Sequence, residues 1–111
     1  MIVYFSRTKM QNACSSEKAM RAEWGDHIAK KLKHRLAELA AADSLADIPH
    51  HPPARCHELG GDRKGQLSVD LVHPYRLIFV PDNDPVPRRE DGGLDRASVT
   101  RVLILEVADT H

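Results

Sequence analysis

One short segment of the chain concentrates side chains that could move protons and bind anions. His57 stands just before a basic, glycine-bounded loop at residues 60–65, which carries Arg63 and Lys64, and Arg76 follows in a later apolar run. Imidazole gains or loses a proton near neutral pH, and the planar arginine fork binds phosphate oxygens in pairs. These groups, placed on one small sheet, could hold and cut a phosphodiester.

The same side chains also admit structural interpretations. A lone strand histidine is most often structural, and a pair of basic residues suits any solvated hairpin tip. Arg76 is costly to bury unpaired, so it must reach an acidic partner, such as Asp70 or Glu106, or face a site. Structural pairing and phosphate clamping both stay open for Arg76. A second titratable cluster, Asp109-Thr110-His111, ends the sequence, and the fold could bring it to the same place.

No metal site or cofactor is expected. His50, His51, Cys56 and His57 lie close in sequence, but their spacing matches no closed zinc pattern, and Cys56 and His57 would point to opposite faces of a strand. The sequence has neither a phosphate-cradling glycine loop of the nucleotide-binding type nor a Gly-x-Ser-x-Gly elbow.

The length of 111 residues predicts a single domain, residues 1–111. Lys plus Arg and Asp plus Glu both number 16, a balance that is unusual for a protein that binds nucleic acid. The charge is uneven, because residues 1–80 hold 12 basic and 9 acidic side chains and residues 81–111 hold 4 and 7. Two cysteines without a paired framework and no apolar run near the roughly 20 residues of a membrane helix favour a cytoplasmic protein outside the membrane.

The pattern of apolar residues predicts the elements that position these groups. Residues 2–5 form a short strand, and a long helical region follows, with Ser15 and Ser16 available to cap it. Gly25-Asp26 interrupts the helical pattern and marks either a break between two helices or a tolerated glycine. The predicted apolar stripe of the helices is Met20, Trp24, Ile28, Leu32, Leu36 and Leu39, with Lys18, Lys30, Lys31, Lys33 and Arg35 opposite.

Three strands are expected at about 54–59, 66–72 and 75–81, and His57 would share a strand face with Arg55. Residues 82–97, which are rich in proline, glycine and acidic side chains, are expected to form a mobile loop. A final strand at residues 99–107, buried on both faces, would complete the sheet. The order of elements predicts an α+β fold with helices on one face of a mostly antiparallel sheet. The sheet side of the core is expected to come from Val69, Leu71, Leu77, Phe79, Leu103 and Leu105.

The run from Arg55 to Val69, the Tyr75 to Phe79 segment and the terminal Asp-x-His resemble the HigB-type plasmid maintenance killer proteins of the RelE/ParE toxin superfamily. The resemblance covers most of the chain. It implies a bacterial type II toxin with a RelE-like fold. Such a toxin enters the ribosome, cuts mRNA there and is bound by a helix-turn-helix antitoxin of the HigA kind.

The resemblance implies specific roles. His57 matches the family's histidine before the basic loop, and Asp109 and His111 match its C-terminal Asp-Tyr-His. With Arg76 they form the expected catalytic set, while Arg55, Arg63 and Lys64 are expected to bind RNA. Cleavage would proceed without a metal, through attack of the RNA 2′-OH, with histidines transferring protons and cations stabilising the phosphorane.

Two alternatives stay open. One is a non-enzymatic toxin of the same fold, similar to the ParE gyrase inhibitors, which needs an interaction surface but no acid–base pair. The other is an interaction protein whose cleavage activity is weakened. Thr110 replaces the aromatic residue of the family motif and cannot stack on a base, and this departure and the neutral charge favour the second alternative.

Overall fold

The computed structural model describes residues 1–110. The helices and strands, in chain order, are β1 Ile2–Phe5, α1 Thr8–Ala13, α2 Glu17–Trp24, α3 Asp26–Ala41, β2 His57–Glu58, β3 Leu67–Asp70, β4 Tyr75–Pro81 and β5 Arg101–Asp109. Short 3-10 helices occupy Leu45–Asp47, Gly61–Arg63 and Arg96–Ser98.

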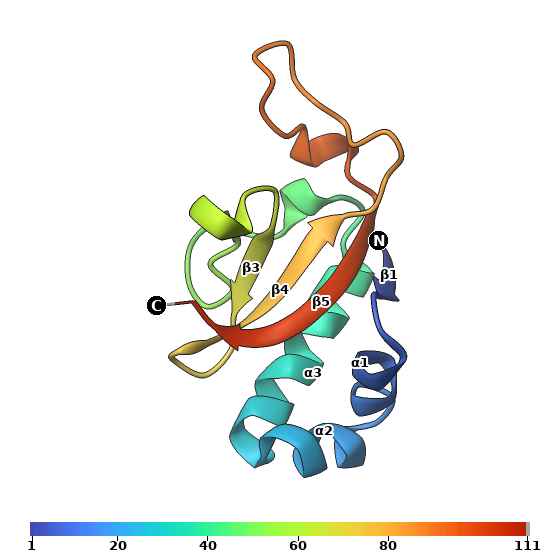
Figure 1. The fold of residues 1–111 in the computed structure, drawn as a ribbon, viewed down its shortest axis with the longest axis vertical. Helices are drawn as coiled ribbons and strands as arrows, with labels where there is room; N and C mark the ends of the chain where they lie inside the picture. Colours follow the sequence, from blue (N-terminus) through green and yellow to red (C-terminus); the bar gives the residue numbers. More distant parts are fainter. Residues whose placement is uncertain (111) are drawn as a thin grey trace.

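The strands form one five-stranded sheet in the order β1-β5-β4-β3-β2 (Figure 1). β1 runs parallel to β5, and the other neighbouring pairs are antiparallel. The predicted α+β class and mostly antiparallel sheet are therefore confirmed. A parallel pair requires a long connection, and the chain between β1 and β5 holds the three helices and the other three strands.

The helical region is divided at Gly25, which settles the alternative that the sequence left open. Gly25 has φ 82° and ψ 169°, a backbone conformation that only glycine adopts without strain, so α2 ends and α3 begins there. Ser16 caps α2, since its side chain accepts a hydrogen bond from the Ala19 N–H at 3.0 Å. α1 was not predicted. Its six residues include a single buried side chain, Met10, which is too little for a periodic pattern.

The prediction of a strand at residues 54–59 is wrong except for two residues, His57 and Glu58. Arg55 has φ 48°, and its N–H donates to the His51 carbonyl, so the chain is turning where a strand was expected. Arg55 and His57 consequently do not share a strand face. The other expected strands hold, with β3 shorter than predicted and β5 displaced by two residues toward the C-terminus.

The core lies between the helices and one face of the sheet. Met20, Leu32 and Leu39 of the expected helix stripe are buried, while Trp24, Ile28 and Leu36 are half-buried against them. Val69, Leu71, Leu77 and Phe79 are buried as predicted.

The prediction that Leu103 and Leu105 belong to this core, and that residues 102–105 are buried on both faces, is wrong. Both leucines are half-buried, and the buried residues of β5 are Val102 and Ile104. Helices cover one face only, so Leu103 lies on the other. β5 also contains a bulge: Glu106 pairs with Ile78 and Ile104 with Phe79, which leaves Leu105 as an extra residue.

Residues 82–97 form a hydrogen-bonded hairpin that extends away from the sheet (Figure 1). Arg88 and Leu94 form an isolated antiparallel bridge, and the Arg89 N–H donates to the Gly93 carbonyl at 2.8 Å. Leu94 is buried and Val86 packs against the core, so the base of the hairpin is attached to the domain. In residues 1–110, no helix is long and apolar enough to cross a membrane.

The mobility expected for residues 82–97 stays a prediction. The backbone amides near the hairpin tip, around residues 89–93, are expected to exchange hydrogen faster than those of β4, because few apolar contacts support the tip. Hydrogen exchange followed by mass spectrometry or NMR measures this. Protection at the tip equal to that of β4 would show that the hairpin is as rigid as the sheet.

Candidate functional site

The candidate site lies on the face of the sheet opposite the helices. Ile78 is fully buried but does not belong to the core between helices and sheet, which places it on this second face. Directly paired residues of neighbouring strands share a face. The register therefore places a row of polar and charged residues around Ile78: His57, Ser68, Asp70, Arg76 and Glu106.

His57 and Arg76 are brought together on this face. Arg76 Nη1 lies 3.1 Å from His57 Nε2, and His57 Nδ1 lies 2.9 Å from the Arg55 carbonyl oxygen. A carbonyl only accepts hydrogen bonds, so Nδ1 carries the proton of the neutral imidazole and Nε2 accepts from Arg76. The turn at Arg55 thus fixes the tautomer and leaves the basic nitrogen of His57 directed at Arg76.

Arg76 also pairs with Asp70, one of the two acidic partners that the sequence suggested. Its Nε lies 3.3 Å from Asp70 Oδ1, and Arg55 Nη1 lies 3.4 Å from Asp70 Oδ2. The Arg76–Asp70 contact has an ion-pair distance but not the angle of a hydrogen bond. Asp70 therefore stabilises two arginines at once, and Arg76 is both paired structurally and presented to His57.

The other suggested partner, Glu106, pairs instead with Arg63. Arg63 Nη1 lies 3.4 Å from Glu106 Oε2 and donates to Gln66 Oε1 at 3.0 Å. These contacts hold Arg63 at the rim of the sheet face. Lys64 is exposed on the same loop.

Asp109, the first member of the C-terminal cluster, lies at the end of the strand next to Arg76. Asp109 pairs in register with Tyr75, and Ala108 pairs with Arg76 itself. Asp109 is thus one residue from the register position of Arg76. His111, the remaining member of the expected catalytic set, lies outside the described residues.

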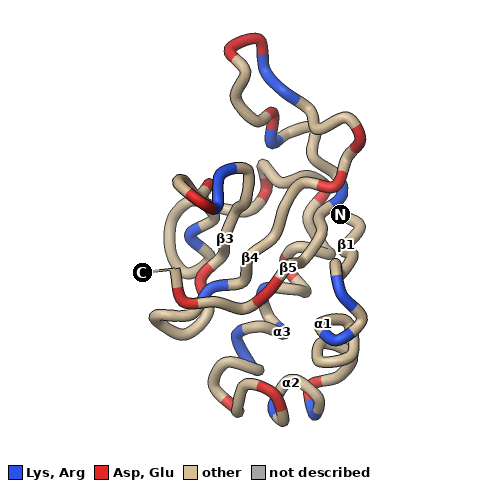
Figure 2. The backbone as a smooth tube through the Cα atoms, in the orientation of Figure 1, with Lys and Arg blue, Asp and Glu red and all other residues tan. Residues whose placement is uncertain are grey.

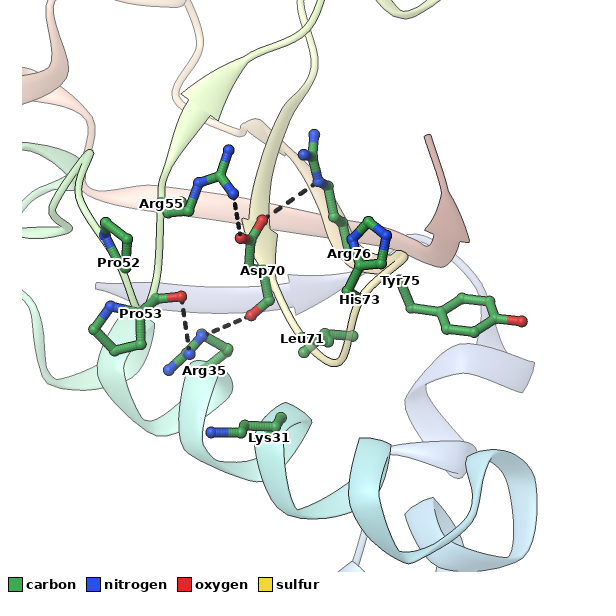
Figure 3. Close-up of a pocket in the computed structure, with 10 residues that line it drawn as sticks. All are labelled: Lys31, Arg35, Pro52, Pro53, Arg55, Asp70, Leu71, His73, Tyr75 and Arg76. Carbon is green, nitrogen blue, oxygen red and sulfur yellow. Dashed lines mark hydrogen bonds and ion pairs between the residues drawn. The ribbon is translucent and has the colours of Figure 1, made fainter. Parts of the chain in front are cut away.

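A cavity of about 290 Å³ adjoins Asp70 and Arg76 at the turn between β3 and β4. Lys31 and Arg35 of α3, Pro52, Pro53, Arg55, Asp70, Leu71, His73, Tyr75 and Arg76 line it (Figure 3). Figure 2 shows Lys and Arg segments on α3 and at the start of β4, on the side of the molecule where the C-terminus lies.

Arg35 corrects one expectation, because the sequence placed it with the solvated lysines of α3. It is 3 % exposed, and its guanidinium donates to the carbonyls of Asp70 at 2.8 Å and Pro53 at 3.2 Å and to Glu38 at 2.6 Å. Arg35 thus connects α3 to the turn at residues 52–55, which carries Arg55, and to β3, which carries Asp70. No sequence signal separates Arg35 from its exposed neighbours, since its partners are distant backbone carbonyls.

Among residues 1–110, no group of three or more His, Cys, Asp or Glu side chains is placed to hold a metal ion. Cys56 is fully buried, and Cys14 is half-buried. Burial raises the pKa of both thiols; for Cys56 it outweighs the opposing attraction of Arg96.

Burial raises the pKa of the Cys14 thiol from 9.0 to about 11, which predicts a pH dependence of stability. Between these values the unfolded chain releases the proton and the folded chain keeps it. The contribution of Cys14 to the free energy of unfolding is therefore complete below about pH 9 and is lost as pH rises toward 11. Urea unfolding of the wild type and of Cys14→Ala at pH 8 and pH 10.5 measures it. The wild type is expected to lose more stability, and equal losses would contradict the prediction.

No protein-family model matches the chain, and no curated protein sequence does. Solved structures of other proteins share its fold, among them these two. A YoeB/ParE toxin from Agrobacterium tumefaciens has a TM-score of 0.57 at 10% identity, over all of both chains. A YoeB–YefM complex from Staphylococcus aureus has a TM-score of 0.56 at 14% identity, over all of this chain and 97% of the other. The protein therefore has the fold of the YoeB/ParE toxins. At these identities the likeness is one of fold.

Proposed function

We propose that the protein is the toxin of a bacterial type II toxin–antitoxin system and that it cuts mRNA on the ribosome. The observation that carries the proposal is the 3.1 Å contact between His57 Nε2 and Arg76 Nη1 on the open face of the sheet. A base with a fixed tautomer beside a phosphate-binding cation is what cleavage of RNA without a metal requires.

In the proposed reaction the 2′-OH of RNA attacks the adjacent phosphorus. A bond forms between the 2′-oxygen and phosphorus, the bond to the 5′-oxygen breaks, and the products are a 2′,3′-cyclic phosphate and a 5′-hydroxyl. His57 Nε2 takes the proton of the 2′-OH. The leaving 5′-oxygen receives a proton from an acid, for which His111 is our candidate.

Arg76 has two tasks in this scheme. In the free protein it donates to His57 Nε2, which occupies the lone pair that the base needs. A bound phosphate attracts the guanidinium more strongly than a neutral imidazole, because an ionic acceptor makes the stronger hydrogen bond. Substrate binding would move Arg76 onto the phosphate and free Nε2 for the 2′-OH proton. Arg63 and Lys64 at the rim, and Arg55 near the turn, would bind the flanking RNA, while Asp109 would orient the C-terminal acid.

A separate antitoxin is part of the proposal. One structure of this fold is YoeB in complex with YefM, so a chain of this architecture occurs with a partner protein. We infer for this chain a helix-turn-helix partner of the HigA kind. Co-purification from the native operon tests the partner.

A non-enzymatic toxin of ParE type, or an interaction protein with weakened cleavage, is the second candidate. Thr110 favours the interaction protein with weakened cleavage, because it offers no aromatic ring at the end of β5, and so does the zero formal charge.

Inducible expression in a bacterium, followed by mapping of RNA 5′ ends, separates these functions. The proposed nuclease produces new 5′-hydroxyl ends within coding regions, and purified ribosomes with mRNA reproduce them. Growth arrest without new RNA ends would support the non-enzymatic toxin. No arrest and no cleavage would support the weakened interaction protein.

A further inference from the structure

The cavity between α3, the 52–55 turn and the β3–β4 hairpin carries an excess of positive charge. Four of its lining residues are cations, Lys31, Arg35, Arg55 and Arg76, and Asp70 is its one carboxylate among residues 1–110. Glu38 neutralises Arg35 through a 2.6 Å contact. The other three cations against one carboxylate leave an excess of two charges, in a chain whose basic and acidic side chains are equal in number.

The positive surface continues along α3. A second cavity of about 200 Å³ is lined by Lys30, Lys31, His34, Arg35 and Pro53, and it shares Lys31, Arg35 and Pro53 with the first. None of its lining residues is acidic. The two cavities therefore adjoin each other at Lys31, Arg35 and Pro53, and we call the pair the α3 groove.

The α3 groove meets the candidate active site at Arg76. Figure 3 shows the guanidinium groups of Arg55 and Arg76 on either side of the Asp70 carboxylate, with Arg35 of α3 beneath Asp70 and Lys31 further along the helix. Arg76 directs Nε toward Asp70 in the groove and Nη1 toward His57 on the sheet face. One side chain thus connects the place where RNA would be cut with the groove.

We propose that the first cavity binds a backbone phosphate of the RNA strand next to the phosphodiester held by His57 and Arg76, an inference that rests on the proposed function. Its volume of about 290 Å³ is near ten times the ~30 Å³ share of one water molecule, which leaves room for a hydrated phosphate group. Arg55 supplies planar donors and Lys31 a mobile point charge, the two kinds of cation that bind phosphate.

The rigid framework of the cavity supports this assignment. The buried Arg35 holds the Pro53 and Asp70 carbonyls, and Asp70 in turn holds Arg55 and Arg76 at 3.4 and 3.3 Å. The donors are therefore positioned before a ligand arrives. Lys31 is exposed, and within residues 1–110 no hydrogen bond or ion pair holds its ammonium group, so a phosphate could recruit it at no cost to the fold.

The test is binding of a short fluorescent RNA whose 2′-O-methyl groups prevent cleavage, followed by anisotropy over a range of NaCl concentrations. Lys31→Ala and Arg55→Ala are each expected to reduce the slope of log affinity against log salt by about 0.7, and the double variant by about 1.4. Arg55→Lys should retain most of the slope. Lys18→Ala, which removes an exposed lysine of α2 outside the groove, is the matched control and should bind like the wild type.

Cleavage of unmodified mRNA on ribosomes, measured in parallel, separates this proposal from the function on which it rests. If the variants show the reduced salt slopes but the wild type does not cleave mRNA, the nuclease is refuted and the phosphate site is supported. Cleavage with wild-type binding and wild-type KM in Lys31→Ala and the double variant would overturn the phosphate site alone, as would the absence of RNA binding by the wild type. Lys31→Ala loses no intramolecular partner, so its result does not depend on a change in folding.

Discussion

Replacing His57 by alanine is expected to lower ribosome-dependent RNA cleavage by about 10²–10⁴-fold, the range that positioned proton transfer contributes. The loss should appear in kcat, because the His57 Nε2 lone pair acts on the 2′-OH proton in the transition state. RNA binding should change little, since Arg55, Arg76 and Lys31 stay in place. The measurement is single-turnover cleavage of mRNA on purified ribosomes, with unfolding recorded for each variant.

His27→Ala is the matched control, because His27 is an exposed histidine on α3 that lines neither cavity. It should cleave at the wild-type rate. Arg76→Ala is less informative, since it would leave the half-buried Asp70 with one cation fewer and alter both folding and catalysis. Wild-type cleavage by His57→Ala would exclude this histidine as the base, and wild-type cleavage by His57→Ala, His111→Ala would exclude histidine acid–base chemistry altogether.

Leu32→Ala is expected to reduce the free energy of unfolding by about 2–5 kcal/mol. Leu32 is fully buried between α3 and the sheet, so its truncation leaves a cavity that the packed core cannot fill. Leu103→Ala should cost clearly less, because Leu103 is half-buried on the face of the sheet that the helices do not cover. Urea unfolding of the two variants provides the comparison. Equal losses would show that the second face is as well packed as the first.

The sequence predicted the elements that a local pattern determines. β1 and β4 lie where the β-branched and aromatic runs placed them, and Ser16 caps a helix as its side chain allows. The pairing of Arg76 with Asp70 could be anticipated because a buried charge requires a partner.

Features that depend on contacts between distant segments could not be predicted in this way. Arg35 is buried because the Asp70 and Pro53 carbonyls come to meet it. The His57 tautomer depends on the backbone reversal at Arg55, whose positive φ is atypical of an arginine. For the candidate site, the sequence could name His57 and Arg76, but the cavity beside them required the packing of α3 against the hairpin.

The extra residue Leu105 in β5 changes the phase of the strand midway. Before it, Val102 and Ile104 supply the hydrophobic core; after it, Glu106 and Ala108 face the site, and the strand ends at Asp109. Side chains alternate between the two faces of a strand, so a one-residue shift normally moves the residues of both faces at once. Here the extra residue turns Glu106 and Ala108 toward the site while Val107 still packs against the core. A substitution at Glu106 or Ala108 can therefore change the site face without removing a side chain from the core.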